Sequence, residues 1–165
     1  MAALEAGKHA PSFSLSLLSG GSFSLADALK QGSVVLAFFK ISCPVCQFTF
    51  PYLQRLQGAA RVKHVTIVGI SQNSKEDTAA FARQYGITFP IALDDTRHYP
   101  VSNSYGITNV PTVFYLDKAG EIEISSVGWS RADIEQIARK IGEAKPAGKL
   151  EVIAPGENVP DFRGG

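Results

Sequence analysis

The sequence predicts an α/β domain in which helices flank a central mixed β-sheet. Its 165 residues include a continuous apolar run, Val34–Phe39, which is typical of a strand buried on both faces. Strand and helix patterns alternate along the chain after this run. The last two strands, Thr112–Leu116 and Ile122–Val127, are separated by a short turn and are expected to pair antiparallel, which makes the sheet mixed.

The elements before the buried run are a hairpin and a short helix. Residues 12–17 and 22–25 alternate apolar and polar side chains on either side of a Gly-Gly pair, which predicts a β-hairpin. Ser24 or Asp27 starts a short helix, and Gly32 ends it. This hairpin therefore precedes the first strand of the sheet.

The elements after residue 60 continue the alternation. Strand patterns lie at 64–70 and 91–93, and the helix between them is capped by Ser74 and closed by Gly86. Ser130 begins the final helix in a pattern that resembles a capping box. Apolar side chains follow one face of this helix, at Ile134, Ile137, Ala138 and Ile141.

A Cys-x-x-Cys motif directly follows the buried run. Pro44 suits the first position of a helix, which makes Cys43 the N-cap. The unpaired N–H groups and the dipole of a helix N-terminus stabilise a thiolate, so we expect Cys43 to be reactive. Cys46 lies one turn later on the same face, close enough to form a disulfide with Cys43. We expect Pro51 to kink this helix and Gly58 to end it.

Other uses of a Cys-x-x-Cys pair fit the sequence less well. A zinc site needs four ligands, and there is no second Cys-x-x-Cys or His-x-x-His. Haem attachment needs a histidine where the chain has Gln47. A purely structural disulfide across so short a loop constrains the unfolded chain little. We therefore expect no metal and no cofactor beyond a redox-active Cys43–Cys46 disulfide.

Composition excludes several broad classes. The chain has 16 basic and 15 acidic residues without a basic cluster, so neither nucleic-acid binding nor membrane-surface binding is suggested. No apolar run approaches the roughly 20 residues that span a bilayer. The first residues lack the basic and apolar regions of a signal peptide. The expected location is cytoplasmic, or periplasmic or otherwise extracytoplasmic if an export signal has been removed.

Four stretches carry a family resemblance: 7–13 as G-K-x-A-P-x-F, 43–51 as C-x-x-C-x-x-x-F-P, the strand–helix unit at 68–90, and Y-G-I-T-N-V-P-T at 105–112. Together they resemble the thioredoxin superfamily. The resemblance is closest to its redoxin branch, the TlpA-like thiol–disulfide oxidoreductases and their AhpC/TSA-type relatives. It implies a thioredoxin-like fold with an N-terminal β-hairpin and a central strand–helix insert.

The resemblance also implies a mechanism. The Cys43 thiolate attacks a protein disulfide, and Cys46 resolves the mixed disulfide. The two residues between them, Pro44 and Val45, influence the reduction potential. A partner protein then reduces or oxidises the pair, and the protein itself is expected to be a monomer.

A second site element is implied at Val110 and Pro111. In the family this loop carries a cis-proline beside the disulfide, and the backbone of the residue before the proline pairs with an extended substrate. Carried over to this chain, Val110 and Pro111 are the substrate contact. A proline that merely starts a strand is the alternative.

The chain departs from its relatives at positions that handle protons. Ala37 stands where thioredoxins carry a buried Asp, and Asn73 lies near the position of a Glu that is frequent in TlpA-like relatives. Ser42 replaces the usual Trp before the motif. Two interpretations of Lys40 stay open: it adds positive potential that tunes the pair, with water transferring the proton, or it is a solvated loop lysine.

Two other functions stay open as alternatives. Peroxiredoxin-like peroxidases, which are antioxidants, place Thr or Ser three residues before the reactive Cys and Pro four residues further back. Before Cys43 these positions hold Lys40 and Leu36, and before Cys46 they hold Cys43 and Phe39. Peroxide reduction therefore remains only a side activity of a reactive thiol. The other alternative is a non-catalytic client-binding or metallochaperone module.

The residues after 145 differ from the rest in composition. We predict a redoxin domain at 1–145 and a Pro/Gly-rich tail at 146–165, with a linker at 145–148. Within the tail, the stretch 156–162 repeats the G-x-x-[A/V]-P-x-F pattern of 7–13. The tail docks as an extra strand, begins a second redoxin unit, or is inert with a chance repeat.

Overall fold

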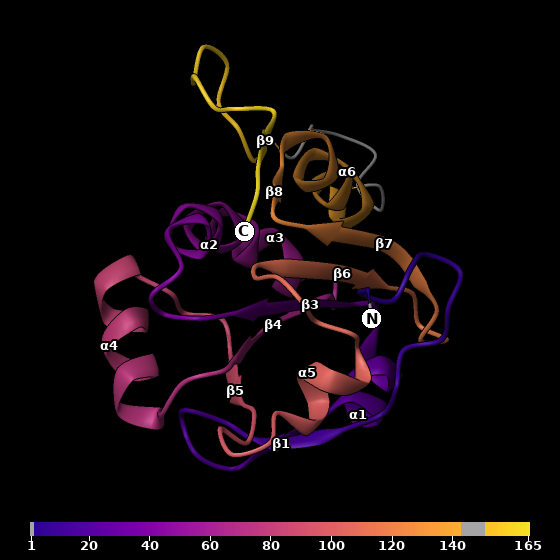
Figure 1. The fold of residues 1–165 in the computed structure, drawn as a ribbon. Helices are drawn as coiled ribbons and strands as arrows, with labels where there is room; N and C mark the ends of the chain where they lie inside the picture. The colour runs from indigo at the N-terminus through magenta and orange to yellow at the C-terminus, as the bar shows by residue number, and fades with distance from the viewer. Residues whose placement is uncertain (1, 143–150) are drawn as a thin grey trace.

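The computed structural model describes residues 2–142 and 151–165, and its centre is one five-stranded sheet (Figure 1). The strands are β3 (Val34–Phe39), β4 (Thr66–Ser71), β5 (Ile91–Leu93), β6 (Thr112–Leu116) and β7 (Ile122–Val127). Their order is β5-β4-β3-β6-β7. Strand β3 is parallel to β4 and antiparallel to β6, so the predicted mixed sheet is confirmed.

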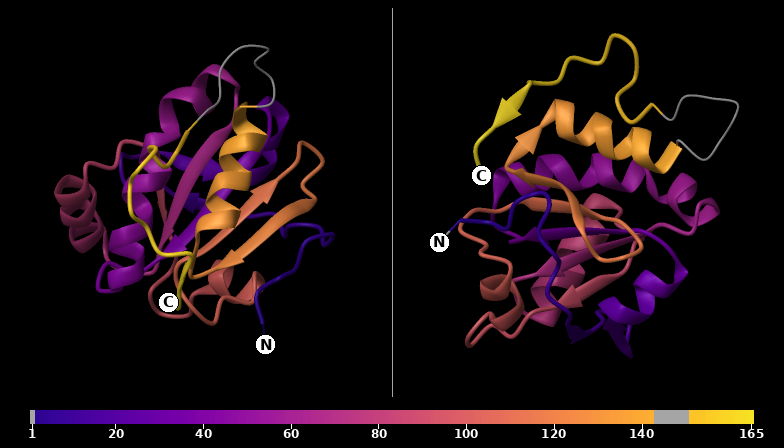
Figure 2. Two further views of the ribbon diagram at one scale, coloured as in Figure 1. Left: turned by 90° about the horizontal axis from the view of Figure 1, so that it is seen from above. Right: turned by 90° about the vertical axis from the view of Figure 1, so that its right-hand side faces the viewer.

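Helices cover both faces of this sheet (Figures 1 and 2). One core contains side chains of α2 (Pro44–Arg55), α3 (Gln57–Val62), α4 (Lys75–Tyr85) and α6 (Arg131–Gly142). The other contains side chains of α1 (Leu25–Gln31), α5 (Pro100–Ser104) and the hairpin β1 (Ser14–Ser16) and β2 (Ser22–Ser24). No helix within the described ranges is long and apolar enough to cross a membrane.

Strand β3 lies in the middle of the sheet and is buried along its whole length. Its side chains alternate between the two cores, as the period of two in a strand requires. Val35, Ala37 and Phe39 belong to the core under α2 and α6. Val34, Leu36 and Phe38 belong to the other. The unbroken apolar run of the sequence thus corresponds to a strand with no solvent-facing side.

The helix starts follow the predicted caps. The Ser24 hydroxyl accepts a hydrogen bond from the Asp27 N–H at 3.3 Å, so Ser24 rather than Asp27 starts α1. Ser74 caps α4 in the same way, and Gly86 ends that helix in the left-handed conformation. The hydroxyl of Ser130 accepts from the N–H of Asp133 at 3.2 Å at the start of α6.

The predicted end of the motif helix at Gly58 is wrong. Helix α2 ends at Arg55, and Gly58 lies inside the next helix, α3. Leu56 and Ala60, on either side of Gly58, are fully buried. Burial of apolar side chains outweighs the roughly 1 kcal/mol that a glycine costs within a helix.

The described part of the tail, residues 151–165 (hereafter the docked tail), packs along α2 and α6 (Figure 2). Val152, Ile153 and Val159 are buried in the same core as those helices. Beyond them, β9 (Phe162–Arg163) pairs antiparallel with β8 (Trp129–Ser130). The docked tail is therefore an extra strand on its own domain. The predicted linker at 145–148 lies outside the described residues, and the division into 1–145 and 146–165 stays a prediction.

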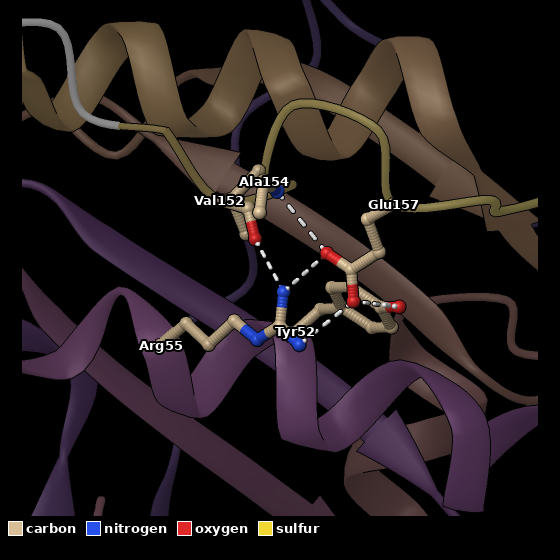
Figure 3. Close-up of polar contacts among 5 residues, drawn as sticks. All are labelled: Tyr52, Arg55, Val152, Ala154 and Glu157. Carbon is tan, nitrogen blue, oxygen red and sulfur yellow. Dashed lines mark hydrogen bonds and ion pairs between the residues drawn. The ribbon is translucent and has the colours of Figure 1, made fainter.

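A polar clasp holds the start of the docked tail against α2 (Figure 3). The Arg55 guanidinium donates to both carboxylate oxygens of Glu157 at 2.7 and 2.9 Å, and to the Val152 carbonyl at 3.0 Å. The Tyr52 hydroxyl donates to the same carboxylate at 3.1 Å. These bonds, chiefly that of Arg55, lower the pKa of Glu157 to about 2.

We expect acid to loosen the docked tail before it unfolds the sheet. The pKa of Glu157 falls on folding from its ordinary 4.5 to about 2, so its contribution is complete above about pH 4.5 and is lost as the pH falls towards 2. Trp129 is the only tryptophan in the chain, is fully buried, and donates its indole N–H to the tail carbonyl of Pro160 at 2.7 Å. Its emission should shift to longer wavelength over this range.

The control for this titration is Glu157→Gln, which keeps the side-chain shape and removes the ionisable group. In this variant the acid-dependent part of the shift between pH 4.5 and 2 should disappear, while far-ultraviolet circular dichroism follows the secondary structure separately. Identical emission profiles for the variant and the parent protein would contradict the clasp.

Candidate functional site

Cys43 lies where the buried strand β3 gives way to helix α2. It is the N-cap residue, with extended backbone angles, and Pro44 takes the first helical position. The Cys46 backbone N–H donates to Cys43 Sγ at 3.2 Å. The sulfur thus accepts a hydrogen bond from one of the helix N–H groups that have no partner within the helix.

Cys46 has a different environment from Cys43. Its side chain is 0% exposed, whereas Cys43 is partly exposed. Burial raises the pKa of Cys46 far above its ordinary value, and the hydrogen bond with Cys43 acts in the same direction. The pair therefore consists of one thiol that solvent reaches and one that is shielded and held protonated.

The loop before β6 completes the site. The Val110–Pro111 peptide bond is cis, as the resemblance implied. The Cys43 thiol donates to the Val110 carbonyl at 3.3 Å. Pro111 is buried, and its carbonyl accepts from the Gly128 N–H at 2.7 Å. Residues predicted from two distant parts of the sequence therefore meet at one sulfur atom.

The three predicted tuning residues surround the pair in different ways. Pro44 is exposed and Val45 is buried. Lys40 is exposed, and its charge lowers the pKa of Cys46, against the larger effect of burial. This gives Lys40 an electrostatic connection to the pair, and its role in redox tuning stays a prediction.

Two residues that the sequence did not identify as functional hold the loop before Cys43. Asn73 Oδ1 accepts from the Ile41 N–H at 2.9 Å, and Gln47 Nε2 donates to the Ile41 carbonyl at 2.9 Å. The backbone N–H and carbonyl of Ile41 are thus held by two side chains, one from the loop after β4 and one from α2. From the sequence, Asn73 differs from relatives only in lying near the position of a Glu. Sequence spacing carries no information on which loop amide a side chain reaches, so this contact of Asn73 is not predictable from the sequence.

A polar cavity of about 200 Å³ adjoins Val110 on the side of α5. It is lined by Lys40, Gln72, Tyr99, Ser102, Asn103 and the loop 107–110. Gln72 donates to the Ser102 hydroxyl at 3.0 Å, and that hydroxyl donates to the buried Asp94 at 2.7 Å. Within the described residues no cluster of three His, Cys, Asp or Glu side chains is arranged to hold a metal ion.

The fold and the paired cysteines are those of a redoxin of the thioredoxin superfamily. The chain belongs to the AhpC/TSA family, which matches residues 6–125. It is 34% identical over 136 residues to the thiol-disulfide oxidoreductase ResA of Geobacillus thermodenitrificans, covering 81% of this chain and 76% of the relative. It is 33% identical over 138 residues to the thioredoxin-like protein YneN of Bacillus subtilis, covering 81% and 78%.

Solved structures agree with this assignment. The thioredoxin domain of a thiol-disulfide oxidoreductase from Bacteroides vulgatus superposes with a TM-score of 0.74 at 27% identity, covering 83% of this chain and 97% of that one. The predicted thioredoxin-like fold, with its hairpin and its strand–helix insert, is confirmed.

We expect alkylation to distinguish the two cysteines. Iodoacetamide at pH 8 should label Cys43 and leave Cys46 unmodified, because Cys46 is buried and its raised pKa keeps it protonated. Mass spectrometry of the folded, reduced protein should show a single adduct. The Cys43→Ser variant should stay unlabelled until it is denatured, and equal labelling of both thiols in the folded protein would contradict the asymmetry.

Proposed function

We propose that the Cys43–Cys46 pair exchanges electrons with protein disulfides or thiols. The observation that supports this most is the asymmetry of the pair: a partly exposed sulfur at a helix N-terminus, beside a buried one a single turn later. Thiol–disulfide oxidoreductase activity is also what the names of the relatives describe, and the chain is an enzyme of this class.

In the reducing direction, the Cys43 thiolate attacks one sulfur of the client disulfide. The client S–S bond breaks, a Cys43–client disulfide forms, and the second client sulfur leaves as a thiolate. Cys46 then loses its proton, attacks Cys43 Sγ and releases the remaining client sulfur. The client gains two electrons and two protons, and the protein holds a Cys43–Cys46 disulfide.

Burial of Cys46 suits the resolving step. A thiol with a raised pKa stays protonated until the mixed disulfide has formed, so it does not compete with Cys43 for the client. Val110, whose carbonyl contacts Cys43, is proposed to pair with an extended client segment, and Pro111 fixes this loop.

The proposal includes the partners. Clients are proteins with thiols or disulfides, and a second protein reduces or oxidises the pair after each turnover. No cofactor beyond the cysteine pair and no metal is required, and we propose a monomer. We propose a cytoplasmic or an extracytoplasmic location.

Trapping tests this function. Cys46→Ser should accumulate a mixed disulfide between Cys43 and a client, because the resolving thiol is absent, and Cys43→Ser should reduce clients no faster than buffer alone. Non-reducing gels and mass spectrometry detect the mixed disulfide and measure the reduction of the client. Failure of the parent protein to form an intramolecular disulfide on oxidation would overturn the proposal.

The direction of exchange follows from the reduction potential, measured by equilibration in glutathione and dithiothreitol buffers with thiol trapping. A value near thioredoxin's, about −270 mV, marks a reductant of client disulfides, and a value near about −120 mV marks an oxidant that installs them.

A further inference from the structure

The last residues of the docked tail lie against the Val110 loop. The Asn109 side-chain amide donates to the Gly165 carbonyl at 3.3 Å. Gly165 approaches Val110 so closely that a Cβ at position 165 would overlap the Val110 carbonyl and lie 3.3 Å from Cδ of Pro111. Only glycine fits here without displacing one of the two segments.

The Val110 carbonyl also accepts the hydrogen bond from the Cys43 thiol. It is also the backbone group that the proposed function assigns to an extended client. We propose that residues 162–165 act as an intramolecular mimic of the client, and that extended polypeptide clients must displace them to reach Val110. The inference rests on the proposed function and identifies what regulates access to the same site.

The repeated sequence pattern indicates that this docking is specific. Gly7 and Gly156, which begin the two copies, both have positive φ angles, of 93° and 80°. At the fourth position of each copy, Ala10 and Val159 are both buried. The two copies therefore share a positive φ at the glycine and burial at the fourth position.

The proline carbonyls of the two copies are also bound alike. The Pro11 carbonyl accepts from the Tyr105 hydroxyl at 2.6 Å, and the Pro160 carbonyl accepts from the Trp129 indole at 2.7 Å. Both aromatic side chains are fully buried. The part of the pattern from the glycine to the proline is therefore held alike in both copies, whereas the last position differs: Phe13 is partly buried and Phe162 is 63% exposed.

The end of the docked tail is held more weakly than its start. Residues 151–160 contribute buried apolar side chains, the clasp of Glu157 and the bond from Trp129. Beyond them, β9 has two residues, Phe162 is 63% exposed, and the Arg163 guanidinium lies 5.0 Å from the centre of the Phe48 ring. Residues 162–165 can therefore leave Val110 while the rest stays docked.

Adjacent glycines provide a matched pair of variants. Gly165→Ala places a methyl group into the Val110 carbonyl, whereas Gly164→Ala meets nothing nearer than 4.0 Å, at the ring of Phe162. We expect Gly165→Ala to raise the second-order rate constant for reduction of a disulfide-linked dimer of an extended peptide. The increase should be about two- to tenfold, the range expected for loss of one hydrogen bond, here that between the Asn109 amide and the Gly165 carbonyl. Gly164→Ala should match the parent protein.

The small disulfide cystamine, which has no peptide backbone, serves as the reference substrate. The measured quantity is the ratio of the peptide rate to the cystamine rate, obtained by acid quenching and mass spectrometry. Deletion of residues 164–165, which retains β9, should raise this ratio as Gly165→Ala does. Unchanged Trp129 emission in all three variants checks that the docked tail upstream keeps its place.

The outcomes separate the two proposals. Absence of exchange with cystamine in the parent protein would reject the proposed function. Normal cystamine exchange with a peptide-to-cystamine ratio that is the same in the parent, Gly165→Ala and the deletion variant would reject the client mimic alone. A ratio that falls in these variants would also reject it, because residues 164–165 would then help to bind the client.

Discussion

The antiparallel ladder between β3 and β6 is the constraint on which the site depends. Its register pairs Phe38 with Thr112, so the residues after Phe39 and those before Thr112 emerge side by side at one edge of the sheet. Cys43 and Val110 are 67 positions apart in sequence, yet this register brings them into hydrogen-bond contact. A shift of one residue in this register would move every side chain of β3 into the opposite core. Burial on both faces therefore fixes the register of β3 and, with it, the position of Cys43 beside Val110.

The asymmetry of the cysteine pair follows from the same framework. Helix α2 follows the buried strand β3, and its buried side chains pack in the core on one face of the sheet. Its N-cap residue meets solvent, while the residue one turn later faces inward. The two thiols thus differ in exposure although they are one helical turn apart. Asn73 and Gln47 hold the loop before Cys43 through their hydrogen bonds to Ile41.

Local patterns in the sequence predict most of the framework, because caps, turns and apolar periods act over a few residues. The Cys43–Cys46 motif, the Ser74 and Ser130 caps and the central strand are all of this kind. The predicted end of the motif helix at Gly58 is wrong because burial of Leu56 and Ala60 overrides the local effect of Gly58. The clasp and the loop contact of Asn73 depend on tertiary neighbours, so no local pattern identifies them.

The docked tail covers the backbone at Val110, next to the partly exposed Cys43. The backbone edge at Val110, which we propose pairs with extended clients, would be open to any extended segment, including one from another copy of the chain. A tail anchored by buried residues at a distance from Val110 covers this edge at a high effective concentration. Its last contacts are few and depend on glycine at position 165. A client with a better-fitting segment then has to displace only these contacts and not the buried anchors, so the edge is protected without being closed.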